Sequence, residues 1–294
     1  MMDAIMKRRE FIKYAAAGAS ALTISPFARI FADETKKKYA NDVMTLGKTG
    51  IKVSRLAMGT GTHGVNRRSN QTRKLGVRGL ADLLHAAYDE GINFWDSADQ
   101  YGTHPHLQEG LRSIPREKVV ILTKTHATTA DEMRTDLDRF RKEIGADYLD
   151  IVLLHCMMDS EWPVSKRGAM EVLTKAREDG IVRAHGVSCH TLGALRAAAN
   201  SDWVQVDLAR INPAGVEMDA EVATVVKVLQ KMHGDGKGVI GMKIFGGGPL
   251  RYQVDECLQY ALGLDFIDAF TIGQESRNEM QDLLKRIPAA SAKA

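Results

Sequence analysis

Residues 119–155 read VVILTKTHATTADEMRTDLDRFRKEIGADYLDIVLLH, and this stretch decides the fold. It begins with an apolar run at residues 119–124 and ends with a second apolar run at residues 149–155. Between them, residues 130–144 place apolar side chains three or four positions apart with charges in between: Met133, Leu137, Phe140 and Ile144. Two short apolar runs that enclose one amphipathic helix are typical of parallel strands joined by a crossover helix.

The same alternation continues along the chain. Eight strands are expected at residues 55–59, 92–96, 119–124, 149–155, 184–188, 204–208, 239–244 and 267–272. Eight helices are expected at residues 80–90, 106–113, 130–144, 165–179, 192–199, 219–233, 253–262 and 277–285. Strict alternation of this length predicts an α/β fold of the (β/α)8 TIM-barrel type rather than an open doubly wound sheet. Residues 43–54 surround the turn signal Gly47-Lys48-Thr49-Gly50 and predict a β-hairpin that closes the bottom of the barrel.

Glycine-rich segments also favour the barrel. A doubly wound nucleotide fold requires a glycine fingerprint that leads directly from its first strand into a helix. Residues 59–64 read GTGTHG, but a basic polar loop follows them, so the match is poor. The run Gly246-Gly247-Gly248 instead follows the seventh expected strand. In TIM barrels, the loops after the last two strands often bind phosphate groups.

Composition indicates one large domain. The chain has 294 residues, of which 44% are hydrophobic and 26% charged, and its formal net charge is +3. After the N-terminal segment, no Lys/Arg cluster is interleaved with aromatic residues, so nucleic-acid binding is not expected. Cys156, Cys189 and Cys257 are odd in number and lack the C-x-x-C spacing of zinc or iron–sulfur sites.

The beginning of the chain has the order of an export signal. Residues 7–13 read KRREFIK, a mildly apolar region follows at residues 14–27, and small residues offer a cleavage point after Ala28 or Ala32. The segment resembles a bacterial twin-arginine signal, which implies the twin-arginine export machinery as a partner and a periplasmic location. A basic amphipathic start or a retained anchor remains the alternative. We therefore predict a signal segment at residues 1–32, a linker at 33–42 and one TIM-barrel domain at 43–294, with no stable membrane span in the mature protein.

Four residues that suit proton-coupled hydride chemistry occur at or just beyond expected strand ends: Asp96, Tyr101, Lys124 and His155. The carboxyl ends of barrel strands meet at one rim, so these side chains are expected to lie together. A lysine at the end of a buried strand is costly unless it is paired, and Asp96 is the expected partner. A phenol, an ammonium and an imidazole supply what a carbonyl needs while it accepts hydride.

In this order and context, the four residues resemble the catalytic tetrad of the aldo-keto reductase superfamily. The resemblance runs from residues 44–54 (MTLGKTGIKVS) to Ile272-Gly273 and the helix after them. It implies an NAD(P)-dependent oxidoreductase that transfers hydride between nicotinamide and an aldehyde, ketone or sugar. Tyr101 would be the general acid or base, Lys124 would lower its pKa, Asp96 would hold Lys124, and His155 would orient the carbonyl.

The resemblance also implies cofactor-binding residues: Ser188, Gln205, Lys243, Gly273, Ser276 and Asp282. Ser188 and Gln205 match residues that hold the nicotinamide carboxamide, but Cys189 replaces the asparagine that usually follows the serine. Lys243 replaces an aromatic residue that stacks on the nicotinamide, and its charge suits a diphosphate.

Gly273 and Ser276 match the loop that binds the adenosine phosphate. Asp282-Leu283 replaces a Glu-Asn pair that contacts adenine. Glu279 stands where an arginine often binds the 2′-phosphate, and Arg277 could take that role. The family resemblance favours NADP, with NAD as the alternative.

Further features leave alternatives open. His63, His126 and Trp162 are expected to line the substrate pocket, although core or surface packing explains such residues equally well. Arg67-Arg68 would meet a polar substrate or remain solvated.

Two other functional classes compete with the oxidoreductase. His104-Pro105-His106, joined by His126 and His155, suggests a metal hydrolase, but the pair follows the wrong strand, so we predict no metal. The altered positions Cys189, Lys243 and Leu283 would instead suit a reductase-like binding or regulatory protein.

Overall fold

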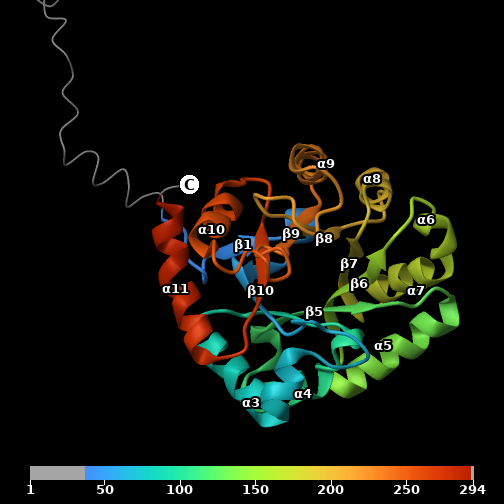
Figure 1. Ribbon diagram of the computed structural model, residues 1–294. Helices are drawn as coiled ribbons and strands as arrows, with labels where there is room; N and C mark the ends of the chain where they lie inside the picture. Colours follow the sequence, from blue (N-terminus) through green and yellow to red (C-terminus); the bar gives the residue numbers. More distant parts are fainter. Residues whose placement is uncertain (1–36, 293–294) are drawn as a thin grey trace, which may run out of the picture. The chain divides into compact units, whose positions relative to one another are not determined.

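The computed structural model describes residues 37–292, and these form a closed barrel surrounded by helices (Figure 1). Eight parallel strands pair in the order β10-β3-β4-β5-β6-β7-β8-β9, which confirms the predicted TIM barrel. The predicted export signal at residues 1–32 and the first part of the predicted linker lie outside the described residues.

The strands and helices alternate as expected. The barrel strands are β3 (Leu56–Gly59), β4 (Phe94–Asp96), β5 (Val120–Thr125), β6 (Leu149–Met157), β7 (Val182–Cys189), β8 (Val206–Arg210), β9 (Gly238–Met242) and β10 (Ala269–Gly273). The α-helices are α3 (Asn70–Asp89), α4 (His104–Gly110), α5 (Ala130–Ile144), α6 (Trp162–Ser165), α7 (Arg167–Glu178), α8 (Leu192–Asn200), α9 (Val222–Gly234), α10 (Val254–Gly263) and α11 (Arg277–Ser291).

Helix bounds match the sequence pattern best where the apolar spacing is regular. Helix α5 has the predicted bounds, with Thr129 as its N-cap and Gly145 in the left-handed conformation at its end. Helix α3 begins ten residues before the predicted start, but its backbone is not helical at Gly76, where φ is 61°. Only the segment after this kink corresponds to the predicted helix. The expected helix at 165–179 is two helices, α6 and α7, which meet at Lys166.

The barrel encloses one apolar cluster and the helices cover another. Inward-facing strand residues such as Phe94, Leu122 and Leu153 fill the interior together with Leu46 and Ile51 of the hairpin. This hairpin pairs β1 (Val43–Thr45) with β2 (Lys52–Ser54) in antiparallel register, and the buried contacts of its apolar residues close one end of the barrel. Burial of a leucine or isoleucine side chain contributes about 1.5–3 kcal/mol, so the closure also stabilises the fold.

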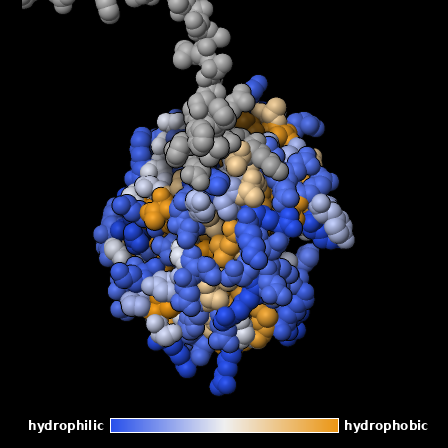
Figure 2. Space-filling model, turned by 90° about the vertical axis from the view of Figure 1, so that its left-hand side faces the viewer, coloured by the Kyte–Doolittle hydropathy of each residue, from blue (hydrophilic) through white to orange (hydrophobic). Residues whose placement is uncertain are grey.

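The outer surface is mostly polar. On the face shown in Figure 2, apolar side chains form small separate patches among polar ones. At the start of the described chain, Lys38 N donates to Ser291 Oγ of α11 at 2.8 Å. Among residues 37–292, no helix combines the length and the apolar character needed to cross a bilayer.

Candidate active site

A buried ion pair lies at the carboxyl end of the barrel. Asp96 is the last residue of β4, and Lys124 lies next to the end of β5. Lys124 Nζ donates to Asp96 Oδ1 and, at 2.6 Å, to the carbonyl oxygen of Ser97. Thr271 Oγ1 donates to the other carboxylate oxygen, Asp96 Oδ2, at 2.9 Å. These hydrogen bonds offset part of the desolvation cost of the buried charges.

Tyr101 covers the Lys124 ammonium. It ends the short 3-10 helix η2 (Asp99–Tyr101), and Lys124 Nζ is 4.8 Å from the centroid of its ring. Burial raises the pKa of Tyr101 above its ordinary value, and the Lys124 charge only partly opposes this. Burial lowers the pKa of Lys124, but Asp96 and Tyr101 outweigh it and leave that pKa raised. At neutral pH the phenol is therefore protonated and the amine is charged.

His155 completes this cluster from β6. Its ring is perpendicular to that of Tyr101, with the centroids 5.9 Å apart, and is stacked on His126 at 4.7 Å. Burial, followed by the charge of Lys124, holds the pKa of His155 well below its ordinary value, so the imidazole is neutral. Its buried Nδ1 atom has no hydrogen-bond partner among the described residues. The structure thus brings Asp96, Tyr101, Lys124 and His155 together around a neutral imidazole and a protonated phenol.

Two of the predicted cofactor residues lie at the same rim. Ser188, next to the end of β7, accepts a hydrogen bond at Oγ from the backbone N–H of Cys156, which follows His155. Lys243 directly follows β9 in the left-handed conformation, with φ 58°. Its ammonium lies 2.8 Å from Glu217 Oε2. Both residues are therefore placed at the carboxyl end of the barrel.

Gln205 lies at the opposite end, which corrects its predicted role. It directly precedes β8, and its carbonyl oxygen accepts from the N–H of Gly238, the first residue of β9. Its side-chain Oε1 accepts from the N–H of His185 at 3.3 Å. The side chain of Gln205 is therefore held at the start of β8, whereas the catalytic cluster lies at the carboxyl ends of the strands.

The remaining predicted cofactor residues surround the start of α11. A Cβ atom added to Gly273 would overlap Thr62 Oγ1, so a larger residue at the end of β10 would require the Thr62 side chain to move. Ser276 caps α11 and accepts from the N–H of Glu279 at 3.2 Å. Asp282 lies farther along the helix and accepts from Arg286 Nε at 2.7 Å.

Comparison with known proteins fits this geometry. The model of the aldo/keto reductase family matches residues 55–284. The chain belongs to this family. It is 24% identical over 201 residues to D-threo-aldose 1-dehydrogenase from a Pseudomonas species, covering 57% of this chain and 60% of that protein. It is 31% identical over 166 residues to 6-dehydroglucose reductase from Novosphingobium aromaticivorans, covering 50% and 51%. The chain thus spans well under two thirds of the length of these curated relatives.

A solved structure shares the fold. An aldo-keto reductase from Bacillus halodurans superimposes with a TM-score of 0.68 at 14% identity, covering 84% of this chain and 90% of that one. Identity this low supports the barrel fold alone. Aldo-keto reductases generally use NAD(P)H, a dinucleotide whose phosphate groups need cations or backbone N–H groups to hold them.

The glycine turn after β9 has room for an anionic group. Gly246, Gly247 and Gly248 all have positive φ, and a Cβ atom added to Gly247 would lie 2.6 Å from Glu217 Oε2. A carboxylate therefore rests in a glycine cradle beside the Lys243 ammonium, as an anionic phosphate group would. A cation, a glycine turn and the N-terminus of α11 at one rim fit the diphosphate and adenosine phosphate of the dinucleotide that the family generally uses.

The predicted substrate residues divide into two groups. His126 Nε2 pairs with Gln100 Oε1 at 2.6 Å and lines a hollow of about 480 Å³ together with Asp99 and Asp136. His63 is exposed on the loop after β3, with Nδ1 3.3 Å from Asn70 Nδ2. Both residues are therefore placed where a substrate could reach them.

Trp162 is instead a core residue, the alternative that its sequence left open. It is 1% exposed, and its indole N–H donates to the carbonyl oxygen of Ala194 at 3.2 Å. His104 is also fully engaged, with Nδ1 2.8 Å from Glu143 and Nε2 2.7 Å from Thr123. His104, Asp99 and Glu143 have potential metal-ligand atoms within 4.8 Å of one another, but arginine side chains already bind both carboxylates.

One buried group was missed by sequence analysis. Asp207, on β8, faces Cys189 Sγ, which lies 3.9 Å from its Oδ1, and its Oδ2 has no hydrogen-bond partner among the described residues. Burial raises the pKa of Asp207 to about 8, and the nearby Asp219 carboxylate adds to that shift. An aspartate within the apolar run at residues 204–208 was the available sequence signal.

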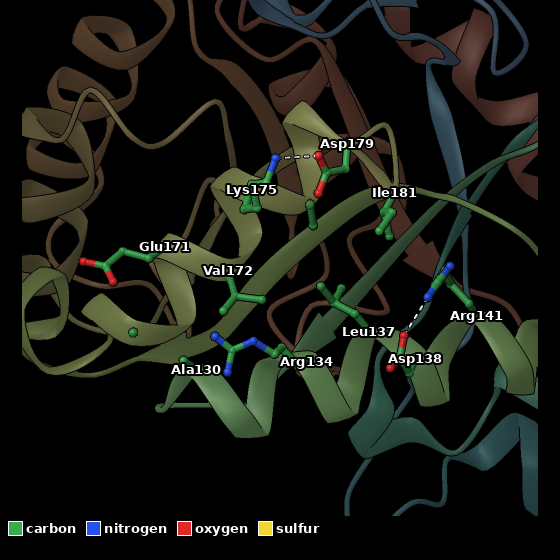
Figure 3. Close-up of a pocket in the computed structure, with 12 residues that line it drawn as sticks. Ala130, Arg134, Leu137, Asp138, Arg141, Glu171, Val172, Lys175, Asp179 and Ile181 are labelled. Carbon is green, nitrogen blue, oxygen red and sulfur yellow. Dashed lines mark hydrogen bonds and ion pairs between the residues drawn. The ribbon is translucent and has the colours of Figure 1, made fainter.

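A groove on the outside of the barrel is separate from this site. It lies between α5 and α7, has a volume of about 370 Å³, and has an apolar floor that includes Leu137 and Val172 (Figure 3). Its charged side chains pair locally, for example Lys175 with Asp179 and Arg141 with Asp138. None of the lining residues belongs to the catalytic cluster at the strand ends.

Proposed function

We propose that this aldo-keto reductase transfers hydride between a nicotinamide cofactor and a carbonyl or alcohol substrate. The observation that carries the proposal is the Tyr101 phenol lying over the Lys124 ammonium, beside a neutral His155 with an unpartnered Nδ1. When bound, reduced nicotinamide would supply a hydride, with its electron pair, to the carbonyl carbon, and the proton that completes the alcohol would come from Tyr101.

The residues of the chain manage the proton and the orientation. Tyr101 donates its phenolic proton to the carbonyl oxygen, and Lys124 stabilises the phenolate that remains. Asp96 holds Lys124 and keeps its charge compensated before reaction. A neutral His155 donates a hydrogen bond that orients the oxygen. In alcohol oxidation the same groups act in reverse.

The raised pKa of Tyr101 gives this chemistry a direction at neutral pH. A protonated phenol is ready to act as an acid, whereas alcohol oxidation needs the phenolate as a base. Reduction is therefore favoured near neutrality, and oxidation is expected to accelerate as the pH rises toward the raised pKa.

A polyhydroxylated carbonyl compound, such as a sugar, is the substrate class we propose. Two relatives are named for sugar oxidation or reduction, D-threo-aldose 1-dehydrogenase and 6-dehydroglucose reductase. The hollow beside His126 is lined by polar side chains, including Thr135 and Asp136, that can hydrogen-bond to hydroxyl groups.

For the cofactor we propose NADP, with NAD as the alternative. Arg277, at the start of α11, is the cation available to a 2′-phosphate, and its NH2 group lies 3.4 Å from the carbonyl oxygen of Asp82. Glu279 opposes it, because its Oε2 already accepts from the N–H of Glu275 at the same helix end. The affinities of the two nucleotides decide between these influences.

The decisive experiment compares wild type with Tyr101→Phe. Binding of NADPH and NADH is followed by fluorescence, and turnover is measured on a panel of aldehydes, ketones and sugars. The variant is expected to bind nucleotide like wild type and to lose turnover by about three orders of magnitude, because the proton donor is gone. Equal turnover by both proteins would contradict the proposed role of Tyr101.

We further propose export to the periplasm through the twin-arginine route, on the basis of residues 1–32 alone. Because that route carries folded proteins, the enzyme would load its nucleotide in the cytoplasm and retain it. A reporter fused after residue 32 should reach the periplasm, and a variant with both Arg8 and Arg9 replaced by lysine should not. A purified mature protein that lacks nucleotide and releases added NADPH rapidly would contradict retention.

A reductase-like binding protein is the second candidate function. The observation that favours it is the Glu217 carboxylate in the glycine cradle, which opposes an anionic ligand. Nucleotide binding with measurable turnover would exclude it. No nucleotide binding at all would support it, whereas weak binding would instead favour a slow enzyme.

A further inference from the structure

The loop after β3 holds the ring of Tyr101 between two glycines. A Cβ atom added to Gly61 would overlap Cε2 of the ring, and one added to Gly64 would overlap Cδ1, on the opposite edge. The N–H of Gly64 donates to the carbonyl oxygen of Gly61 at 2.9 Å, so the two glycines form one tight turn. The backbone of the loop therefore restrains the phenol from both edges.

The tip of this loop adopts a conformation that its sequence does not favour. Val65 and Arg68 exchange backbone hydrogen bonds at 2.9 and 3.0 Å, and Asn66 and Arg67 between them have φ angles of 51° and 57°. A two-residue turn with positive φ at both positions strongly prefers glycine second. An arginine in that position costs backbone strain, so its side chain must be held by other contacts.

Arg67 has those contacts on both sides of Tyr101. Its guanidinium lies 3.3 Å from Asp99 Oδ1, two residues before Tyr101, and 2.8 Å from Glu143 Oε1 of α5. Its carbonyl oxygen presses on Gly102, directly after Tyr101, where an added Cβ atom would overlap it. Gln100 Nε2 donates to the carbonyl oxygen of Gly64 at 3.2 Å. The loop thus contacts each neighbour of Tyr101 along the chain.

The partners of Arg67 are themselves anchored near the catalytic lysine. Glu143 Oε2 binds His104 Nδ1 at 2.8 Å, and His104 Nε2 lies 2.7 Å from the hydroxyl of Thr123, the residue before Lys124. Arg139 NH1 donates to Asp99 Oδ1 at 2.6 Å. The loop is therefore connected to the same strand that carries Lys124.

We propose that Arg67 is a positioning residue that clamps the loop of residues 60–69 over Tyr101 and so fixes the phenol against Lys124. The proposal rests on the proposed function, in which Tyr101 is the proton donor. Arg67 itself touches no reacting atom in this assignment. Its release leaves the phenol free to move from the carbonyl oxygen. The contacts of Arg67 described above involve neither Lys243 nor Gly247, so the glycine cradle after β9 should keep its shape.

The test uses substitutions at Arg67 that separate strain from clamping. Arg67→Gly removes the side chain but suits the turn, so a purely structural role predicts equal or higher stability and unchanged turnover. The clamp predicts that kcat falls about tenfold to a hundredfold while the Kd for NADPH stays within about twofold, since misplacing a reacting group costs rate rather than cofactor affinity. Arg67→Lys, which keeps the charge, should restore part of kcat.

Arg78→Gln is the control, because Arg78 is an exposed arginine on α3, outside the loop. It should leave kcat unchanged. Wild-type kcat in Arg67→Gly, or an equal loss in Arg78→Gln, would overturn the clamp.

A second readout needs no activity. Nitration of tyrosines by tetranitromethane, mapped by mass spectrometry, should proceed faster at Tyr101 in Arg67→Gly than in wild type, relative to Tyr252, which is 82% exposed. Unchanged nitration of Tyr101 overturns the clamp even if no substrate is turned over. If nitration of Tyr101 is faster in Arg67→Gly but wild type turns over none of the tested substrates, the clamp stands and the proposed function is contradicted.

Discussion

The rim of the barrel has two halves that are prepared for their ligands in different ways. At the ends of β4, β5 and β6 lie the buried groups Asp96, Lys124 and His155. Asp96 and Lys124 form an ion pair, the pKa of Lys124 is raised, and the pKa of His155 is lowered. At the turn after β9, the ammonium of Lys243 pairs with Glu217, and both side chains are more than one third exposed. The first half is preorganised, and the second is neutralised by the chain itself.

The difference determines which half of the rim must rearrange when a ligand binds. Groups that stabilise a transition state act best when they need no rearrangement at the moment of reaction. The half that receives the diphosphate must first release its own carboxylate. Variants of the first half should therefore change turnover and stability strongly, and variants of the second should change affinity modestly.

The largest expected effect comes from breaking the buried pair. Lys124→Met leaves Asp96 buried without its ammonium, so we expect kcat to fall by about three orders of magnitude and the free energy of unfolding to fall by about 3–5 kcal/mol. Urea unfolding and steady-state turnover measure the two losses.

A double variant, Asp96→Asn with Lys124→Met, separates these effects. It should recover much of the stability and none of the activity, because the unpaired charge is gone but the phenol still lacks its cation. Recovery of turnover in the double variant would contradict the assigned role of Lys124.

Regular local patterns made the first half readable from sequence. The unit from β5 through α5 to β6 follows from apolar spacing, and strand ends in a TIM barrel place Lys124 and His155 at one rim. Gln205 was misassigned although the expected strand at 204–208 already put it near that strand's beginning. A motif match cannot reveal which end of the barrel a residue occupies unless its place in the strand is also considered.

Side-chain pairs between distant parts of the chain could not be predicted from sequence. Arg67 binds Glu143, 76 residues later, and no local spacing connects them. From sequence, Arg67 had only two interpretations, a solvated charge or a substrate contact. The direction of the pKa shift of Tyr101 could not be predicted from sequence either. Burial raises this pKa more than the Lys124 charge lowers it, and the burial arises only when the loop folds over the ring.

The next largest effect concerns the buried carboxyl group of Asp207 on β8. Asp207 has a folded pKa of about 8, above its ordinary value of 3.8. Between these values the folded protein binds more protons than the unfolded chain, so the free energy of unfolding decreases as the pH rises. One such group contributes about 1.4 kcal/mol per pH unit between pH 5 and pH 7.

Asp207→Asn removes this dependence. Urea unfolding at several pH values should show the variant gaining stability over wild type by that amount per unit, with the difference smallest near pH 5. Stability curves that stay parallel from pH 5 to pH 7 would contradict a neutral buried Asp207.

The smallest expected effect concerns the carboxylate in the glycine cradle. Glu217→Gln removes the negative charge beside Lys243 and Gly247 while keeping the side-chain shape. Because an anionic ligand then displaces no carboxylate, NADPH and inorganic diphosphate should bind about tenfold more tightly at low salt, a gain of about 1.4 kcal/mol. Salt screens exposed charges, so the gain should shrink at high ionic strength. Glu256→Gln is the control, because Glu256 is exposed on α10, and it should leave both affinities unchanged. If Glu217→Gln weakens binding instead, the carboxylate helps to hold the ligand, and this half of the rim is also preorganised.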